Sequence, residues 1–228
     1  MRGYEQNASS WVYDELRQRI VNLIYKPGQE IGIQSLAEGF GVSRSPVRDA
    51  LLRLGRDRLV DIFPQKGTRV AYLDRDIIMQ ERFLRAAVET RVLDAYMDRQ
   101  CTVAQWDMSL SRLQADIVLQ QTALSSGDVE TFLQYDIDFH VIFYEDAGLE
   151  RIGKVVQAHT GNEHRARLLN AKDTKENRDC IMAEHQAIMD AIRKKDKAEV
   201  KALLEVHLGR LTGQLDYLEK AYPDFFRK

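Results

Sequence analysis

The stretch LAEGFGVSRSPVRDAL, residues 36–51, decides the fold of the N-terminal third of the chain. Gly41 supplies a tight turn between two helical patterns, because glycine adopts left-handed backbone conformations at little steric cost. Ser43 is placed to cap the second helix, and Pro46 fits in its first turn, where no amide donor is required. The pattern therefore predicts helix, turn and helix, with helices near residues 34–40 and 44–57.

The second helix of this pair presents polar residues at its N-terminal end. Arg44, Ser45 and Arg48 lie there, and this end of such a helix is the part that enters the DNA major groove. Arginine can donate two hydrogen bonds to guanine O6 and N7. Helix-turn-helix geometry also occurs in proteins that never touch DNA, and two arginines on one helix usually form a solvated face. The flanking segments therefore have to support the interpretation.

The segments on either side complete a winged helix. Upstream, residues 10–25 have apolar residues at helical spacing, with Ser9 or Ser10 as a cap and Pro27-Gly28 as the end. Downstream, two short apolar stretches, 59–63 and 68–73, are joined by residues 64–67, which contain both Pro and Gly and predict a β-hairpin. Lys66 lies at the tip of this wing, where it can meet phosphate or the minor groove. Residues 1–73 are predicted to form a winged helix-turn-helix domain.

The charge distribution agrees with a DNA-facing N-terminal third. Residues 1–73 contain 11 Lys and Arg against 8 Asp and Glu, although the whole chain of 228 residues has a net charge of −2. The remaining residues therefore carry the acidic excess. A local basic excess has the sign expected for a domain that meets phosphates.

The rest of the chain predicts helices only. Helical patterns cover residues 74–99, 102–125, 128–147, 149–169, 174–194 and 196–221. Asp74, Thr102, Asp128 and Thr174 are expected as N-caps. The fold is therefore predicted as mainly α, with a six-helix bundle over residues 74–228.

Composition excludes several classes of protein. No apolar run approaches the roughly 18 residues that cross a bilayer, and the first ten residues lack a signal-peptide core. The two cysteines, Cys101 and Cys180, are interpreted as reduced thiols. The expected location is the cytoplasm, with no membrane partner.

Histidine and aspartate spacing points to a metal site in the helical domain. Asp136 and His140 lie four residues apart on one predicted helix and so share a face. His185 and His207 lie on the apolar faces of two later helices. Three imidazoles and a carboxylate directed into a bundle suit Zn²⁺, Ni²⁺, Co²⁺ or Mn²⁺. For each histidine alone, a hydrogen-bonded core residue is the better interpretation, and the pattern by itself leaves both a metal site and a polar core open.

The N-terminal segment resembles the GntR family of bacterial regulators. The resemblance covers residues 10–73, through segments 27–28, 36–38, 42–51 and 67–71. It implies that Arg44, Ser45, Arg48 and the wing tip Lys66-Gly67 contact DNA, and that Gln34 matches a further position that reaches DNA in some members. Arg58 departs from the pattern, which usually has glycine there.

Residues 74–221 resemble the FCD effector-binding domain of the FadR subfamily, in its shorter VanR-like type. The motif Arg85-x-x-x-Glu89, the pair Asp136 and His140, and the two later histidines follow the metal-binding branch of that domain. The resemblance implies that Asp136, His140, His185 and His207 hold a divalent cation, beside which a small organic acid binds.

Arg85 is the predicted clamp for the effector carboxylate, since a guanidinium matches a carboxylate with two hydrogen bonds. An ion pair with Glu89, one turn further on, is the alternative. Asn162 and Arg165 are expected to line the same cavity. His159 and His164 are interpreted as solvent-facing or as neighbours of the metal ligands.

These observations favour a homodimeric, sequence-specific regulator, more often a repressor, that binds a double-stranded operator and responds to a small carboxylate. Two alternatives stay open. In the first, the cation itself is the signal. In the second, the helical domain is a metal-dependent enzyme, although the sequence offers no obvious general base near the histidines.

Overall fold

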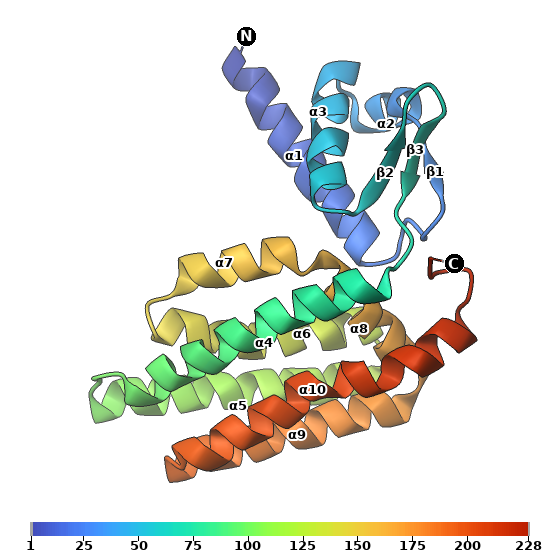
Figure 1. Cartoon of the computed structure of the whole chain (residues 1–228). Helices are drawn as coiled ribbons and strands as arrows, with labels where there is room; N and C mark the ends of the chain where they lie inside the picture. The colour runs from blue at the N-terminus through green and yellow to red at the C-terminus, as the bar shows by residue number, and fades with distance from the viewer. Residues whose placement is uncertain (1, 228) are drawn as a thin grey trace.

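The computed structural model describes residues 2–227, with side chains from Ala8 onward. Residues 1 and 228, the outer limits of the two predicted domains, lie outside the described residues. Within the described chain, a unit of three helices and a small sheet stands on a unit of seven helices (Figure 1). The prediction of a mainly α fold with an N-terminal winged helix-turn-helix is confirmed.

The N-terminal unit has the expected elements and one additional strand. Its elements are α1 (Arg2–Val21), β1 (Glu30–Ile31), α2 (Ile33–Phe40), α3 (Arg44–Arg56), β2 (Val60–Phe63) and β3 (Gly67–Val70). The strands pair antiparallel in the order β1-β3-β2, so β3 is central. The sequence did not reveal β1, because two residues are too few to show the alternation of a strand.

The turn between α2 and α3 follows the glycine prediction. Gly41 has a φ of 65° and closes α2 by donating its amide to carbonyl oxygens of the last turn. Pro46 and Val47 are buried in the first turn of α3, which fixes that helix against the core. Ser43 occupies the N-cap position, but its side chain makes no capping hydrogen bond.

The first helix differs from its prediction at both ends. It begins at Arg2, so Ser9 and Ser10 lie inside it rather than at its cap. It ends at Val21, before Pro27, because Leu23 adopts a left-handed φ of 57° and closes the last turn. The helix packs across α3. Their shared core contains Leu16, Ile20, Val47, Leu51 and Leu54.

The C-terminal unit has seven helices instead of six. They are α4 (Arg75–Asp98), α5 (Val103–Ser126), α6 (Val129–Asp146), α7 (Glu150–His159), α8 (Gly161–Asp173), α9 (Lys175–Lys194) and α10 (Lys197–Ala221). The four predicted N-caps Asp74, Thr102, Asp128 and Thr174 all accept backbone amides.

The prediction of one helix over residues 149–169 is wrong. The chain leaves helical geometry at Thr160, where φ is −122° and ψ is 34°, and α8 begins at Gly161. Glu81 of α4 accepts the backbone amides of Asn162 at 2.8 Å and Glu163 at 2.9 Å. A carboxylate from another helix thus stabilises a new N-terminus in the middle of an uninterrupted helical pattern.

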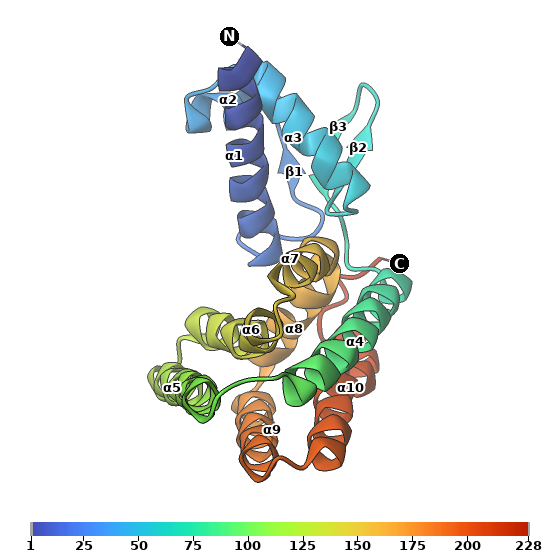
Figure 2. The ribbon, with the colours of Figure 1, turned by 90° about the vertical axis from the view of Figure 1, so that its left-hand side faces the viewer.

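The two units meet at the end of α1, above α7 and α8 (Figures 1 and 2). A Cβ on Gly161 would lie only 3.2 Å from Leu59 of the N-terminal unit, so the contact is close. Leu73, just before α4, exchanges backbone hydrogen bonds with Phe225 and Arg227 near the C-terminus. No helix in the described part of the chain is both long and apolar enough to cross a membrane.

Candidate metal centre and nucleic-acid interface

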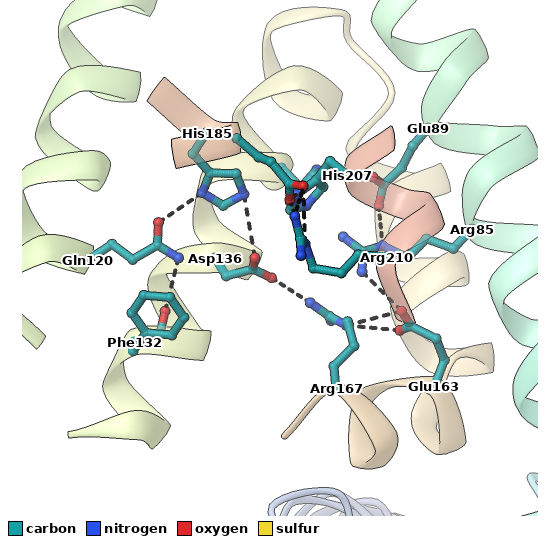
Figure 3. Close-up of polar contacts among 12 residues, drawn as sticks. Arg85, Glu89, Gln120, Phe132, Asp136, Glu163, Arg167, His185, His207 and Arg210 are labelled. Atoms are coloured by element: carbon teal, nitrogen blue, oxygen red, sulfur yellow. Dashed lines mark hydrogen bonds and ion pairs between the residues drawn. The ribbon is translucent and has the colours of Figure 1, made fainter. Parts of the chain in front are cut away.

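The four predicted metal ligands converge inside the helical unit, and Figure 3 shows Asp136, His185 and His207. Asp136 and His140 come from successive turns of α6, His185 from α9 and His207 from α10. One donor atom from each residue lies within 4.8 Å of all the others, and all four residues are buried. The sequence prediction that these side chains share one interior point therefore agrees with the geometry.

Each histidine is oriented through its Nδ1 atom. His185 Nδ1 lies 2.8 Å from Oε1 of Gln120, and His207 Nδ1 lies 3.0 Å from Oε2 of Glu184. His140 Nδ1 lies 3.0 Å from Oε2 of Glu89. A hydrogen-bond acceptor at Nδ1 of His185 and His207 places the proton there and leaves the Nε2 lone pair free, and the carboxylate near Nδ1 of His140 favours the same tautomer. All three rings can therefore offer the lone pair of Nε2 to a metal ion.

The Nε2 atoms face one another and Asp136. His140 Nε2 and His207 Nε2 are 3.1 Å apart, and His185 Nε2 lies 3.5 Å from Oδ1 of Asp136. His185 Nε2 is buried and has no hydrogen-bond partner among the described residues. A buried ring nitrogen without a partner is costly unless something fills the position.

Burial keeps His140 and His185 neutral. It lowers the pKa of His140 against the opposing effect of Glu89, and burial together with His207 lowers the pKa of His185 well below the ordinary value. Burial opposes ionisation of Asp136, but the neighbouring guanidinium of Arg167 holds the pKa of this carboxyl below its usual range. His140 and His185 are consequently neutral and Asp136 is ionised, which are the protonation states that bind a cation.

The donor set fits a divalent cation. Ligands at about 2.1 Å from one ion lie at most about 4.2 Å apart, so donors within 4.8 Å need only a small inward shift. Three imidazole nitrogens and one carboxylate oxygen match borderline first-row metals and do not match Ca²⁺ or Mg²⁺, which prefer oxygen.

A ring of ion pairs surrounds the four residues. Arg167 bonds Asp136 and, at 3.1 Å, Glu163. Arg210 bonds Glu184, the acceptor for His207. Sequence reasoning missed these positions, and the one available signal was that Glu184 directly precedes His185.

Arg85 forms the ion pair with Glu89 that was the alternative to an effector clamp. Its Nε lies 2.7 Å from Oε1 of Glu89, and its Nη1 lies 3.2 Å from Oε1 of Glu163. The residue still lines the cavities on either side of the metal ligands. Its guanidinium is therefore near a prospective effector but already holds two carboxylates.

Asn162 and Arg165 do not line the cavity that was expected for them. The Asn162 amide donates to Glu81 at 2.8 Å. Arg165 donates to Asn162 at 3.1 Å and to the carbonyl oxygen of Ala71 at 2.6 Å. The two side chains bond to the start of α8 and to the junction between the units, so they do not line the cavities beside the four metal-ligand candidates, and their contact with an effector stays a prediction.

The other two histidines differ in position. His159 is exposed at the end of α7, as expected. His164 is half-buried on α8, and its Nε2 lies 3.4 Å from Oδ1 of Asn22, just beyond α1. It therefore contacts the N-terminal unit rather than the metal ligands.

The predicted DNA-contacting residues all lie on the surface. Gln34, Arg44, Ser45, Arg48, Lys66 and Gly67 are exposed. Arg44 donates to Gln34, so α2 and α3 form one polar surface. Gly67 has a φ of 103° at the wing turn, where the wing lies beside α3 (Figure 2). Arg58 has a left-handed φ of 57°, which explains why glycine is the usual residue there.

Two family models match the chain. Residues 8–70 match the family described as bacterial regulatory proteins, gntR family. Residues 84–210, more than half of the chain, match the FCD domain. The boundary between the two matches falls in the segment where the wing ends and α4 begins.

Relatives of similar length are transcriptional regulators. An HTH-type transcriptional regulator in an unstable DNA locus of Streptomyces ambofaciens is 29% identical over 94% of this chain and 88% of its own length. The HTH-type transcriptional repressor RspR of Escherichia coli K12 is 23% identical, covering 97% and 94%. The gluconate operon transcriptional repressor of Bacillus licheniformis is 24% identical, covering 90% and 83%.

Solved structures share the fold. The E. coli protein McbR/YncC superposes with a TM-score of 0.76 at 18% identity, covering 94% of this chain and 98% of the other. A GntR transcriptional regulator from Rhodococcus sp. RHA1 gives 0.71 at 20% identity, covering 95% and 96%. The arrangement of the two units is thus an established architecture.

Proposed function

Because the chain belongs to the GntR family of bacterial transcriptional regulators and carries an FCD domain, we propose that it is a repressor whose operator affinity is controlled by a small carboxylate bound at or near a divalent cation. The observation that carries the proposal is the buried cluster of Asp136, His140, His185 and His207 in the same chain as an exposed helix-turn-helix surface. Two similar proteins are named as repressors, one of them of the gluconate operon.

The proposed operator-reading residues are those at the start of α3. Arg44, Ser45 and Arg48 are exposed there and meet base edges in the major groove. Lys66 and Gly67 bring the wing to the sugar-phosphate backbone or the minor groove. Gln34, bonded to Arg44, positions that arginine beside the DNA.

Asp136, His140, His185 and His207 would hold the cation. When bound, a divalent cation supplies a positive centre to which a carboxylate can bind. Gln120, Glu89 and Glu184 keep the three imidazoles in the required tautomer. Of the predicted effector residues, Arg85 alone lines the adjoining cavity, and it orients Glu89.

A homodimer is proposed because an operator with two half-sites requires two winged helices. An exposed apolar patch on α4, which includes Phe83 at 76% and Leu84 at 38% exposure, suits contact with a second copy.

One alternative has a specific observation in its favour. Four protein donors complete a tetrahedral shell by themselves, so the cation could be the signal without any organic acid. An enzyme is not supported, because the matched families and relatives are transcriptional regulators.

The test is thermal unfolding of the full-length protein with a panel of small carboxylates, before and after treatment with a chelator. A ligand at a hundredfold excess over its Kd stabilises the native state by about 2.7 kcal/mol. We expect one class of carboxylate to raise the Tm, and we expect that increase to disappear after chelation. Metal-controlled operator binding with no response to any carboxylate would instead establish the metal-sensing alternative.

A further inference from the structure

A cavity of about 350 Å³ lies between the DNA-binding unit and the helical unit. One wall is the end of α1, with Arg17, Gln18 and Val21. The opposite walls come from α4, α6, α7 and α8 and include His140, one of the proposed metal ligands. The cavity therefore extends from the metal cluster to the helix on which the recognition helix packs.

Tyr144 of α6 is an unused donor in this cavity. Its side chain is 4% exposed, and its buried hydroxyl has no hydrogen-bond partner among the described residues. Burial and the neighbouring Glu89 raise the pKa of Tyr144, so the hydroxyl keeps its proton and is available to donate. The ring packs against Gly153 of α7, which fixes its direction.

Arg17 of α1 is the second incompletely used donor. It donates to the backbone carbonyl of Gln157 on α7, while its Nε is buried without a partner. Unlike Arg85 and Arg167, it has no carboxylate partner in the part of the chain that the structure describes. A guanidinium without an acid partner, at the wall of a partly enclosed cavity, is suited to bind an anion.

The charges that line the cavity favour an anion. The guanidinium groups of Arg17, Arg85 and Arg167 face two carboxylates, Glu89 and Asp138. Glu89 is already bound to Arg85 and His140. A carboxylate entering the cavity would meet two donors that have free hydrogen-bonding capacity, one from each unit of the protein.

We propose that the effector occupies this interdomain cavity, with its carboxylate held jointly by Arg17 of the DNA-binding unit and Tyr144 of the helical unit. This inference rests on the proposed effector function and adds a route for regulation. A ligand that touches both units binds one relative arrangement of them in preference to others. Since α1 and α3 share a core, the selected arrangement fixes the position of the recognition helix and so changes operator affinity.

The test uses the full-length, metal-loaded protein and three probes, citrate, malonate and D-gluconate, in isothermal titration. We expect Y144F to weaken binding of the responsive probe about tenfold, as for one lost hydrogen bond, and R17A to weaken it by about tenfold or more. R17A should also diminish the change in operator affinity that the probe causes. R19A is the matched control, because Arg19 lies on the same helix, pairs with Glu15 and does not line the cavity.

The outcomes separate this inference from the function on which it rests. If the wild-type protein binds none of the probes, the effector function fails and the inference fails with it. If the wild-type protein binds a probe and both variants bind it equally well, the carboxylate lies elsewhere and only the inference is overturned. A lower Tm of R17A with an unchanged Kd would mean that Arg17 merely holds α7 in place.

Discussion

At the scale of single residues, the three histidines of the proposed metal site have different hydrogen-bonding or ion-pair partners at Nδ1. His185 is oriented by the neutral amide of Gln120, whereas His140 and His207 are oriented by carboxylates. A carboxylate acceptor makes the ring more basic and so a stronger ligand. The two carboxylates are in turn neutralised by Arg85 and Arg210, so they are stable in the interior.

Replacing Glu184 should therefore weaken the metal site without removing a ligand. We expect Glu184→Ala to lower metal affinity by about 10–100-fold, because His207 loses the acceptor that fixes its tautomer. Competition with a chelating dye would measure this change. Glu205→Ala, which removes an exposed carboxylate from the same helix, is the control. Equal affinities of the two variants would contradict the role assigned to Glu184.

The raised pKa of Asp116 on α5 predicts that the stability of the protein depends on pH. Burial, and then repulsion from Asp138, raises the pKa of Asp116 from 3.8 to about 6. Because the folded-state pKa is the higher one, the native state is favoured while the carboxyl is protonated. That stability is lost as the pH rises from about 4 through about 6.

The substitution Asp116→Asn should remove the loss of stability that accompanies ionisation of this carboxyl at higher pH. We expect the variant to be more stable than the wild-type protein by about 1 kcal/mol at pH 7.5, after allowing for solvent screening, and by less at pH 4.5. Urea unfolding at the two pH values measures the difference. A gain that does not grow between pH 4.5 and pH 7.5 would argue against the raised pKa.

At the scale of elements, the helix-turn-helix was predictable because its signals are local. Gly41, Pro46 and the spacing of apolar residues act within a few positions of one another. The convergence of Asp136, His140, His185 and His207 in the interior was also predictable, since helical periodicity indicates which side chains face inward. The start of α8 was not predictable, because it depends on Glu81, about eighty positions earlier in the chain. The partners of Asn162 and Arg165 were not predictable for the same reason, because Glu81 and Ala71 are also distant in the sequence.

Arg48 of α3 should contribute sequence-specific affinity. We expect Arg48→Ala to weaken binding to an operator selected from a random DNA library by about 1–3 kcal/mol, and to relax the preference at one base pair. Arg56→Ala, at the opposite end of α3, is the matched control. Fluorescence anisotropy with the selected and a scrambled duplex measures both effects. If the two variants lose the same affinity on both duplexes, Arg48 contacts phosphate only.

The break between α7 and α8 should depend on Glu81. Its carboxylate accepts two backbone amides and the Asn162 side chain. We expect Glu81→Ala to destabilise the protein by about 2 kcal/mol, since hydrogen bonds to a charged group are lost in a partly buried position. Gln80→Ala, at the neighbouring exposed position, should change the unfolding free energy little. Chemical denaturation of both variants tests this, and an unchanged stability of the Glu81 variant would contradict it.

At the scale of the whole molecule, the exposed apolar residues of α4 bear on assembly. Phe83 is 76% exposed, although Arg85 on the same helix is buried. We expect Phe83→Glu to shift a dimer toward monomer, because a charge would then be buried in the contact. Light scattering after gel filtration measures the mass. Val103→Glu on α5, where Val103 is 79% exposed, is the control and should remain dimeric. A dimeric Phe83 variant would place the contact elsewhere.

The position of the last ligand has a consequence during synthesis. The winged helix is complete once residue 70 has been made, but His207 lies on α10, the last helix. At roughly 5–20 residues per second, the ribosome needs on the order of ten seconds to cover that interval. During this time the growing chain carries a complete DNA-binding domain and lacks one of the four residues of the proposed metal site. A chain interrupted before α10 would keep its DNA-binding domain. It would lack the complete site through which, under the proposed function, the effector releases the protein from the operator.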